Sequence, residues 1–338
     1  MSRLGAALRE DGDAAAFPPG AVEPVRPVPA APRVGLALGG GSARGWAHIG
    51  VIQGLEEAGI HPAMVAGCSI GAVVGACYAA GKLDLLADFA LSLTRRRVVG
   101  LLDLRLTGSG LIGGGRLRRR LLRDLGERRT EDLPVGFACV ATELGTGHEV
   151  WLTRGPLVET VRASYALPGI FPPVSLDGRL LMDGTLVNPV PVSLARALGA
   201  DLVICVNLNC DPRVRGGLIE PDGPDPVGRA VAGAVEVRRR GLLHAVRGRW
   251  RRGRPEPGEA QAPGIARVMF EAFNITQDRI SRARLERDPP DVGIRPDLAD
   301  MGQFEFHRAA EGIERGRQAA RAALPRIRAM LEGAAARV

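Results

Sequence analysis

Aromatic residues are scarce in this chain and make up only 4% of its 338 residues. Proteins that bind single-stranded nucleic acid usually stack the bases on aromatic side chains. The composition therefore argues against such a protein. Hydrophobic residues still make up 46% of the sequence, so Ala, Val and Leu must build the core. The chain is long enough for one large domain or two ordinary ones.

Neither a disulfide framework nor a membrane-spanning segment is visible in the sequence. The five cysteines are an odd number, and none forms a C-x-x-C pair, which favours reduced thiols in a cytosolic protein. No apolar run reaches the roughly 18 residues that span a bilayer, and residues 1–11 lack the apolar core of a signal peptide. We expect a cytoplasmic protein that is soluble or peripheral at the inner membrane surface.

Lysine is almost absent, since Lys82 is the only one and arginine supplies the remaining basic charge. The formal net charge of +8 is concentrated in residues 95–97, 116–129 and 238–254. Such clusters suit an anionic partner, for example an anionic membrane, although solvated helix faces explain them equally well. We do not expect nucleic acid as a partner, because residues 238–254 resemble a disordered basic loop. The sequence does not indicate an oligomeric state.

Four segments differ in composition. Residues 1–32 are rich in Ala, Pro and charge and predict a flexible tail. Residues 33–210 alternate apolar strands with helices, which predicts an α/β domain with a parallel sheet covered by helices. Residues 211–263 are rich in Pro, Gly and Arg and predict a basic, partly disordered insertion with one helix near residues 228–250. Residues 264–338 predict C-terminal helices that complete the same domain.

The apolar patterns predict individual elements along this chain. Strands are expected at residues 34–38, 63–66, 135–142, 149–153, 179–184, 202–207 and 292–294. Helices are expected at 43–58, directly after Ser69, within 84–124, at 156–166, 194–198, 265–285 and 305–331. Because proline lacks the N–H donor that a helix needs, the last helix should break or kink at Pro325.

The most informative motif is Gly67-Cys68-Ser69-Ile70-Gly71, a G-x-S-x-G run between an apolar strand and a small-residue helix. A serine on this turn exposes its hydroxyl above the sheet, and side chains at Gly67 and Gly71 would crowd the turn. Ser69 is therefore the candidate nucleophile. Cys68 is not a candidate, because its side chain should point into the core.

A second glycine run follows the first strand and opens a helix. Its backbone N–H groups at Gly39, Gly40, Gly41 and Ser42 predict an anion site. The site could cradle a nucleotide phosphate or stabilise the oxyanion formed by attack on an ester. The first use is disfavoured because the G-x-G-x-x-G spacing fails and no acidic residue closes the following strand.

Asp183 is the candidate base, at a strand end and beside the turn residue Gly184. It could accept the Ser69 proton directly or be the middle member of a triad, while an Asx-turn explains it equally well from local sequence. His307 alone gives the Ser, Asp, His order of an α/β-hydrolase, yet it starts a charged helix. No metal-ligand cluster is visible, so we expect no metal or other cofactor.

Four stretches in this order resemble a bacterial patatin-like phospholipase of the branch related to neuropathy target esterase. They are residues 35–52, 67–72, 166–174 and 183–191, and the resemblance covers roughly residues 33–210. It implies a patatin-like three-layer α/β/α fold with a mostly parallel central sheet. It also implies a serine lipid acyl hydrolase, whether phospholipase, lysophospholipase or esterase, with a lipid or acyl ester as substrate.

By this resemblance Ser69 and Asp183 form a dyad without a catalytic histidine, and the loop from Gly39 to Ser42 supplies the oxyanion donors. The residues that the resemblance implies as loop supports are Arg44, Gly45, Gly67, Gly71 and Gly184. Ser42 departs from the family, which often has glycine there, and Thr185 replaces its usual glycine or alanine. Two alternatives stay open: a regulatory or membrane-binding protein with little turnover, and a triad completed by His307.

Overall fold

The computed structural model of the protein describes residues 32–101, 103, 110–209 and 265–335. The expected tail lies outside the described residues except for Pro32. The expected insertion at 211–263, with its helix near 228–250, lies wholly outside them.

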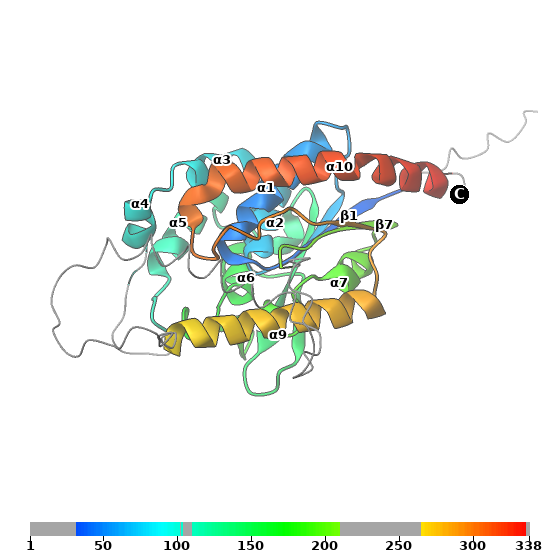
Figure 1. The fold of residues 1–338 in the computed structure, drawn as a ribbon. Helices are drawn as coiled ribbons and strands as arrows, with labels where there is room; N and C mark the ends of the chain where they lie inside the picture. Colours follow the sequence, from blue (N-terminus) through cyan, green and yellow to red (C-terminus); the bar gives the residue numbers. More distant parts are fainter. Residues whose placement is uncertain (1–31, 102, 104–109, 210–264, 336–338) are drawn as a thin grey trace, which may run out of the picture. The chain divides into compact units, whose positions relative to one another are not determined.

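An eight-stranded mixed sheet forms the centre, in the order β5-β6-β3-β2-β1-β7-β8, with β4 paired to β3 (Figure 1). Five strands pair in parallel across β3, β2, β1, β7 and β8, whereas β4, β5 and β6 join by antiparallel pairs. The strands are β1 Val34–Leu38, β2 Met64–Cys68, β3 Gly136–Glu143, β4 Glu149–Leu152, β5 Val174–Leu176, β6 Arg179–Asp183, β7 Leu202–Val206 and β8 Val292–Ile294. The prediction of a mostly parallel sheet is confirmed.

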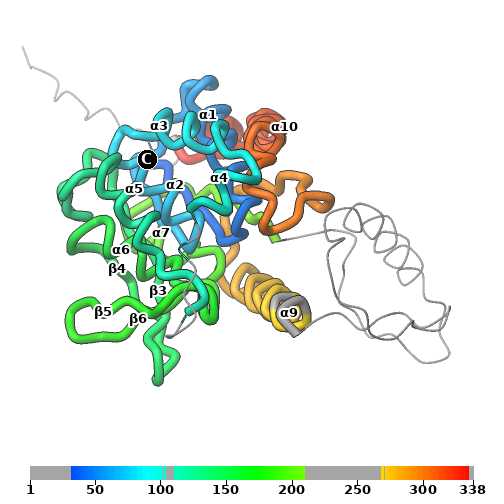
Figure 2. The backbone as a smooth tube through the Cα atoms, turned by 90° about the vertical axis from the view of Figure 1, so that its left-hand side faces the viewer, coloured from blue at the N-terminus to red at the C-terminus, as the bar shows by residue number. Residues whose placement is uncertain are grey.

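Helices cover both faces of this sheet, which makes the fold a three-layer α/β/α arrangement. One face carries α1 Trp46–Glu56, α2 Ile70–Ala79, α3 Leu83–Leu91, α6 Leu157–Ser164 and α10 Ala309–Ala335. The other carries α7 Val192–Ala197 and α9 Ile265–Arg287. In the view turned by 90°, α9 and α10 are seen almost end-on, on opposite sides of the sheet (Figure 2).

The two-residue period of the strands divides the core between these faces. In β1, Leu36 and Leu38 pack with the α1 and α2 side, whereas Ala37 packs with the α7 side. In β7, Ile204 faces the first side and Val203 the second. Because both faces of the sheet are buried, the sequences of the inner strands are continuously apolar. These apolar runs allowed the strands to be predicted from the sequence.

Three elements differ from expectation. The first expected helix begins as a 3-10 turn, η1 Ser42–Gly45, before α1. Strand β5 was not predicted, since only three residues form it. Helix α10 continues through Pro325, so of the predicted break or kink the break is contradicted. Ala320 and Ile327 lie on either side of this proline and are both fully buried, so tertiary packing keeps the helix continuous.

Two further helices, α4 Arg95–Leu101 and α5 Gly115–Leu125, lie within the basic stretch that was expected to be helical. Among the described helices, none combines the length and the apolar character that a bilayer span requires.

Candidate active site

Ser69 occupies the sharp turn between β2 and α2. Its backbone has φ 54° and ψ −120°, a region that residues other than glycine rarely adopt and that is often found at functional sites. The Ser69 N–H donates to Ser164 Oγ at 3.0 Å, and this hydroxyl donates to the Val140 carbonyl at 2.7 Å. The end of α6 thus ties the strained turn to β3.

The glycines around the turn allow backbone segments to pass very close to one another. A methyl group on Gly71 would lie 2.1 Å from the Leu38 carbonyl oxygen, and one on Gly67 would lie 2.5 Å from Ala72 Cα. A methyl group on Gly45 would lie 2.1 Å from Ile70 Cγ1, and one on Gly184 would lie 2.2 Å from the Val140 carbonyl oxygen. A side chain at any of these positions would push the two loops and the Asp183 turn apart.

The structure places Asp183 against the serine. Ser69 Oγ donates a hydrogen bond of 2.7 Å to Asp183 Oδ2. The other carboxylate oxygen, Oδ1, accepts from the Thr185 N–H at 2.9 Å and from Thr185 Oγ1 at 2.7 Å. Asp183 is 1% exposed, and Thr142 Oγ1 holds its backbone carbonyl at 2.8 Å. Both carboxylate oxygens are thus engaged, one with the candidate nucleophile.

Burial raises the pKa of Asp183 to about 6, while hydrogen bonds from Thr185 and Ser69 oppose the rise. A general base works best when its pKa lies near the working pH, because it is then both ionised and basic. The environment of Asp183 therefore makes its carboxylate more basic than that of an ordinary aspartate.

The glycine loop after β1 passes directly beside these two residues. A methyl group on Gly40 would lie 3.6 Å from Ser69 Cβ and 2.3 Å from Thr185 Cγ2. The Gly39 N–H donates to the Val206 carbonyl at 3.1 Å, and the Gly40 N–H donates to the Pro189 carbonyl at 3.0 Å.

Two of the four expected oxyanion donors are thus already engaged. The N–H groups of Gly41 and Ser42 make no hydrogen bond to the described part of the chain. Ser42 has a positive φ of 49° and opens η1. Of the four expected donors, these are the two that have no partner among the described residues.

His48 and Arg44 form hydrogen bonds that support the glycine loop and the η1 turn after it. His48 is fully buried, and its Nε2 lies 2.7 Å from the Gly39 carbonyl oxygen, so this nitrogen must donate. Burial lowers the pKa of His48 to about 4, against the hydrogen bond to Gly39, which keeps the ring neutral. Arg44 Nε donates to the Met301 carbonyl at 2.9 Å and so joins η1 to the segment before α10.

No histidine in the described ranges forms a hydrogen bond with Asp183. His307 lies in the short helix η4 Phe306–Arg308, and its Nε2 is 3.4 Å from Arg95 Nε. Within the part of the chain that the structure describes, no group of three or more His, Cys, Asp or Glu side chains could hold a metal ion. Cys68 is fully buried, as its alternation along the strand predicted.

Sequence reasoning missed two residues that support the site. Ser164 closely precedes the 166–174 stretch, and its position could have drawn attention to it. Gln277 carried no local signal, although its Nε2 donates to Thr185 Oγ1 at 2.8 Å across 92 positions of sequence. Only the folded chain brings α9 to the Asp183 turn.

Comparisons with known proteins identify relatives of this chain. Residues 36–196 match the family model of the patatin-like phospholipases. An NTE family protein of Mycobacterium tuberculosis (strain H37Rv) is 36% identical over 87% of this chain and 91% of its own length. The lysophospholipase NTE1 of Pyricularia oryzae is 31% identical over 84% of this chain but only 18% of its own length.

Among solved structures, VipD from Legionella pneumophila matches 88% of this chain and 67% of its own, with 14% identity and a TM-score of 0.40. The mycobacterial relative and the family model together define the family. The chain therefore belongs to the patatin-like phospholipases, in the branch of the NTE proteins.

Proposed function

We propose that the protein hydrolyses lipid acyl esters with Ser69 as nucleophile and Asp183 as general base. The observation that carries the proposal is the 2.7 Å hydrogen bond from Ser69 Oγ to Asp183 Oδ2. A buried carboxylate in direct contact with a hydroxyl on a strained turn is the arrangement that activates such a nucleophile. Membership of the patatin-like phospholipases supports a lipid ester as the substrate.

In the proposed mechanism Asp183 accepts the proton as Ser69 Oγ attacks the acyl carbonyl. The N–H groups of Gly41 and Ser42 stabilise the tetrahedral oxyanion, a contribution of about 3 kcal/mol per donor in favourable cases. Asp183 then returns the proton to the leaving alcohol or lysolipid, and an acyl-serine ester remains. Asp183 next removes a proton from water as the water attacks the ester, and it passes this proton to Ser69 Oγ as the bond to the acyl group breaks, which frees the fatty acid and restores both residues.

The substrate class and the location belong to the same proposal. The fungal relative is a lysophospholipase, so phospholipids and lysophospholipids are the first substrates to test. We place the protein in the cytoplasm, in peripheral contact with an anionic membrane. A protein of the same fold that binds lipid with little turnover is the competing function.

A fluorophosphonate probe tests the nucleophile, and a panel of phosphatidylcholine, lysophosphatidylcholine and a short-chain ester tests the substrate. We expect labelling and hydrolysis in the wild type and neither in Ser69→Ala. Ser175→Ala is the matched control, because Ser175 is an exposed serine on β5. Hydrolysis retained by pure Ser69→Ala protein would overturn the proposal, and absent turnover in the wild type would favour the binding protein.

A further inference from the structure

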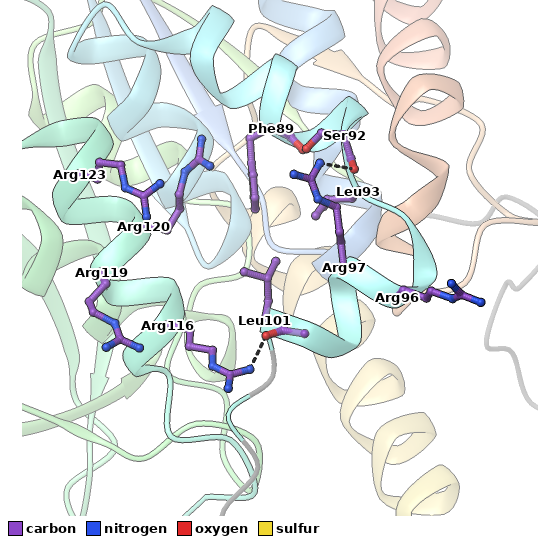
Figure 3. A pocket seen from close by; sticks show the side chains of 11 residues that line it. Phe89, Ser92, Leu93, Arg96, Arg97, Leu101, Arg116, Arg119, Arg120 and Arg123 are labelled. Atoms are coloured by element: carbon purple, nitrogen blue, oxygen red, sulfur yellow. Dashed lines mark hydrogen bonds between the residues drawn. The ribbon is translucent and has the colours of Figure 1, made fainter.

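A pocket of about 710 Å³ lies between α3 and α4 on one side and α5 on the other (Figure 3). Its lining contains no acidic residue. The arginines that line it are Arg96, Arg97, Arg116, Arg119, Arg120 and Arg123. We call this feature the arginine pocket. The Ser69 dyad lies outside it, so the proposed hydrolysis does not account for so much positive charge in one place.

Most of this charge is not compensated by carboxylates. Arg120 pairs with Asp124 and lies over the ring of Phe89, 4.5 Å from its centroid. Arg97 and Arg116 donate to backbone carbonyl oxygens, those of Ser92 and Gly100. Across the described residues, the side chains of Arg96, Arg119 and Arg123 form no ion pair, and all three are exposed. A guanidinium carries five N–H donors, so every arginine of the pocket keeps donors for an anion.

The surroundings of the pocket are apolar. Phe89, Leu93 and Leu101 line it beside the arginines. Helix α4 has no buried residue, and its Val99 is 65% exposed. Leu91 at the end of α3 is 54% exposed, and Leu111 before α5 is 60% exposed. A helix that shows arginines and exposed aliphatic side chains together has the composition of an element that lies in a membrane interface.

A chain of contacts joins the pocket to the site. The segment that leads into α5 forms two backbone hydrogen bonds with residues 169–170. The Leu111 N–H donates to the Gly169 carbonyl at 3.1 Å, and the Ile112 N–H donates to the Ile170 carbonyl at 2.8 Å. The next residue, Phe171, packs against Tyr165 with ring centroids 5.3 Å apart. Tyr165 directly follows Ser164, which holds the Ser69 N–H. The wall of the pocket and the turn of the nucleophile are therefore parts of one packed region.

We propose that the arginine pocket binds the phosphate headgroup of an anionic phospholipid while that lipid remains in a bilayer. Arginine pairs with phosphate through two parallel N–H···O bonds, and the charge of the pocket complements an anionic surface. A free phosphate compound would leave Leu91, Val99 and Leu111 in water, whereas a bilayer buries them. The bilayer is therefore the occupant that suits both the charge of the pocket and the exposed aliphatic side chains on α3, on α4 and before α5. Hydrolysis of the docked lipid rests on the proposed function, but the binding does not.

The binding test uses Ser69→Ala protein, which removes the candidate nucleophile, and vesicle sedimentation at low salt. Vesicles are phosphatidylcholine alone or phosphatidylcholine mixed with phosphatidylglycerol. We expect binding to the mixed vesicles only. Adding Arg119→Gln and Arg123→Gln should weaken it roughly tenfold to thirtyfold, since each basic residue at an anionic surface contributes about a fivefold gain. The matched control adds Arg154→Gln and Arg328→Gln, which are exposed arginines outside the pocket.

Equal loss in the two double variants would overturn the proposal, because general charge would then explain the binding. Equal binding to neutral vesicles would overturn it as well. Thermal stabilisation by glycerol 3-phosphate without vesicle binding would point to a soluble phosphate ligand instead and would also contradict it. Unchanged melting temperatures of the variants show that the fold is intact.

A second readout separates this proposal from the proposed function. With Ser69 restored, the Arg119→Gln/Arg123→Gln variant should lose hydrolysis of vesicle lipid and keep hydrolysis of a soluble short-chain ester. If this variant keeps both activities, the docking role is contradicted. If the wild type hydrolyses neither substrate, the proposed function fails. The sedimentation result still decides whether the arginine pocket binds anionic lipid.

Discussion

Gln277 on α9 donates from Nε2 to Thr185 Oγ1 at 2.8 Å. Because this oxygen accepts from Gln277, its own hydrogen is free to donate to Asp183 Oδ1, 2.7 Å away. The glutamine thereby fixes the direction of the Thr185 hydroxyl. A side chain from the face of the sheet that carries α7 and α9 thus supports the ionised form of Asp183 without a hydrogen bond to Ser69.

The first prediction concerns this positioning residue. In Gln277→Ala the Thr185 hydroxyl can rotate, and the hydrogen bond to ionised Asp183 weakens. A weaker bond to the charged form raises the pKa of Asp183 further, so the acid limb of the pH–rate profile should move to higher pH and kcat should fall about tenfold. KM should change little. Gln318→Ala, at an exposed position on α10, is the control, and a fall in activity with no shift of the limb would indicate a merely structural role.

The wild-type pH profile makes a second prediction. Burial raises the pKa of Asp183 to about 6, and only the ionised form can accept the Ser69 proton. The value of kcat/KM reports the free enzyme, so it should rise with pH through about 6 and level off above. The measurement is initial rates on a soluble ester across the pH range. A limb at the ordinary aspartate pKa would contradict the assignment.

The third prediction is that Asp183→Asn stabilises the protein while it abolishes turnover. The folded-state pKa lies above the ordinary value of 3.8, so the folded protein binds the proton more tightly than the unfolded chain. The ionised carboxylate therefore costs stability above about pH 6 and costs nothing below the ordinary value. A shift of about two units corresponds to roughly 3 kcal/mol.

Urea unfolding at two pH values measures this effect. Asp183→Asn should exceed the wild type in free energy of unfolding at about pH 8, and the difference should vanish at about pH 4. Asp177→Asn, at an exposed turn, is the matched control for the removal of one carboxylate. If Asp183→Asn raised the free energy of unfolding equally at both pH values, packing and not the buried charge would explain the gain.

Features that depend on neighbouring residues could be predicted from the sequence, whereas features that depend on tertiary contacts could not. Ser69 and Asp183 sit in short motifs whose glycines and flanking apolar strands are visible in the sequence, so both residues could be named as candidates. Strand β5 was missed because its three residues, Val174–Leu176, follow Pro172 and Pro173 and show too short a period. Helix α10 passes Pro325 because burial at Ile327 outweighs a local rule.

The glycine loop shows the limit within the site itself. The sequence offered four adjacent N–H groups from Gly39 to Ser42 as oxyanion donors. Which of them are available depends on the carbonyls of Val206 and Pro189, which the Gly39 and Gly40 N–H groups contact. These partners come from β7 and from the turn after Asp183, so only tertiary structure reveals the occupied donors. The same reason hid Gln277.

The last prediction separates a dyad from a triad. His307 contacts Arg95, with 3.4 Å between His307 Nε2 and Arg95 Nε, whereas the two oxygens of Asp183 are engaged by Ser69 and Thr185. His307→Ala should therefore keep kcat/KM within about twofold, because the proposed mechanism passes no proton through its ring. A loss of about 10³-fold or more is what removal of a triad member produces, and this result would restore the histidine. His148→Ala, on an exposed hairpin residue, sets the baseline for removing an imidazole. Activity of the two variants on a soluble ester, measured side by side, decides between a carboxylate that acts alone and one that acts through an imidazole.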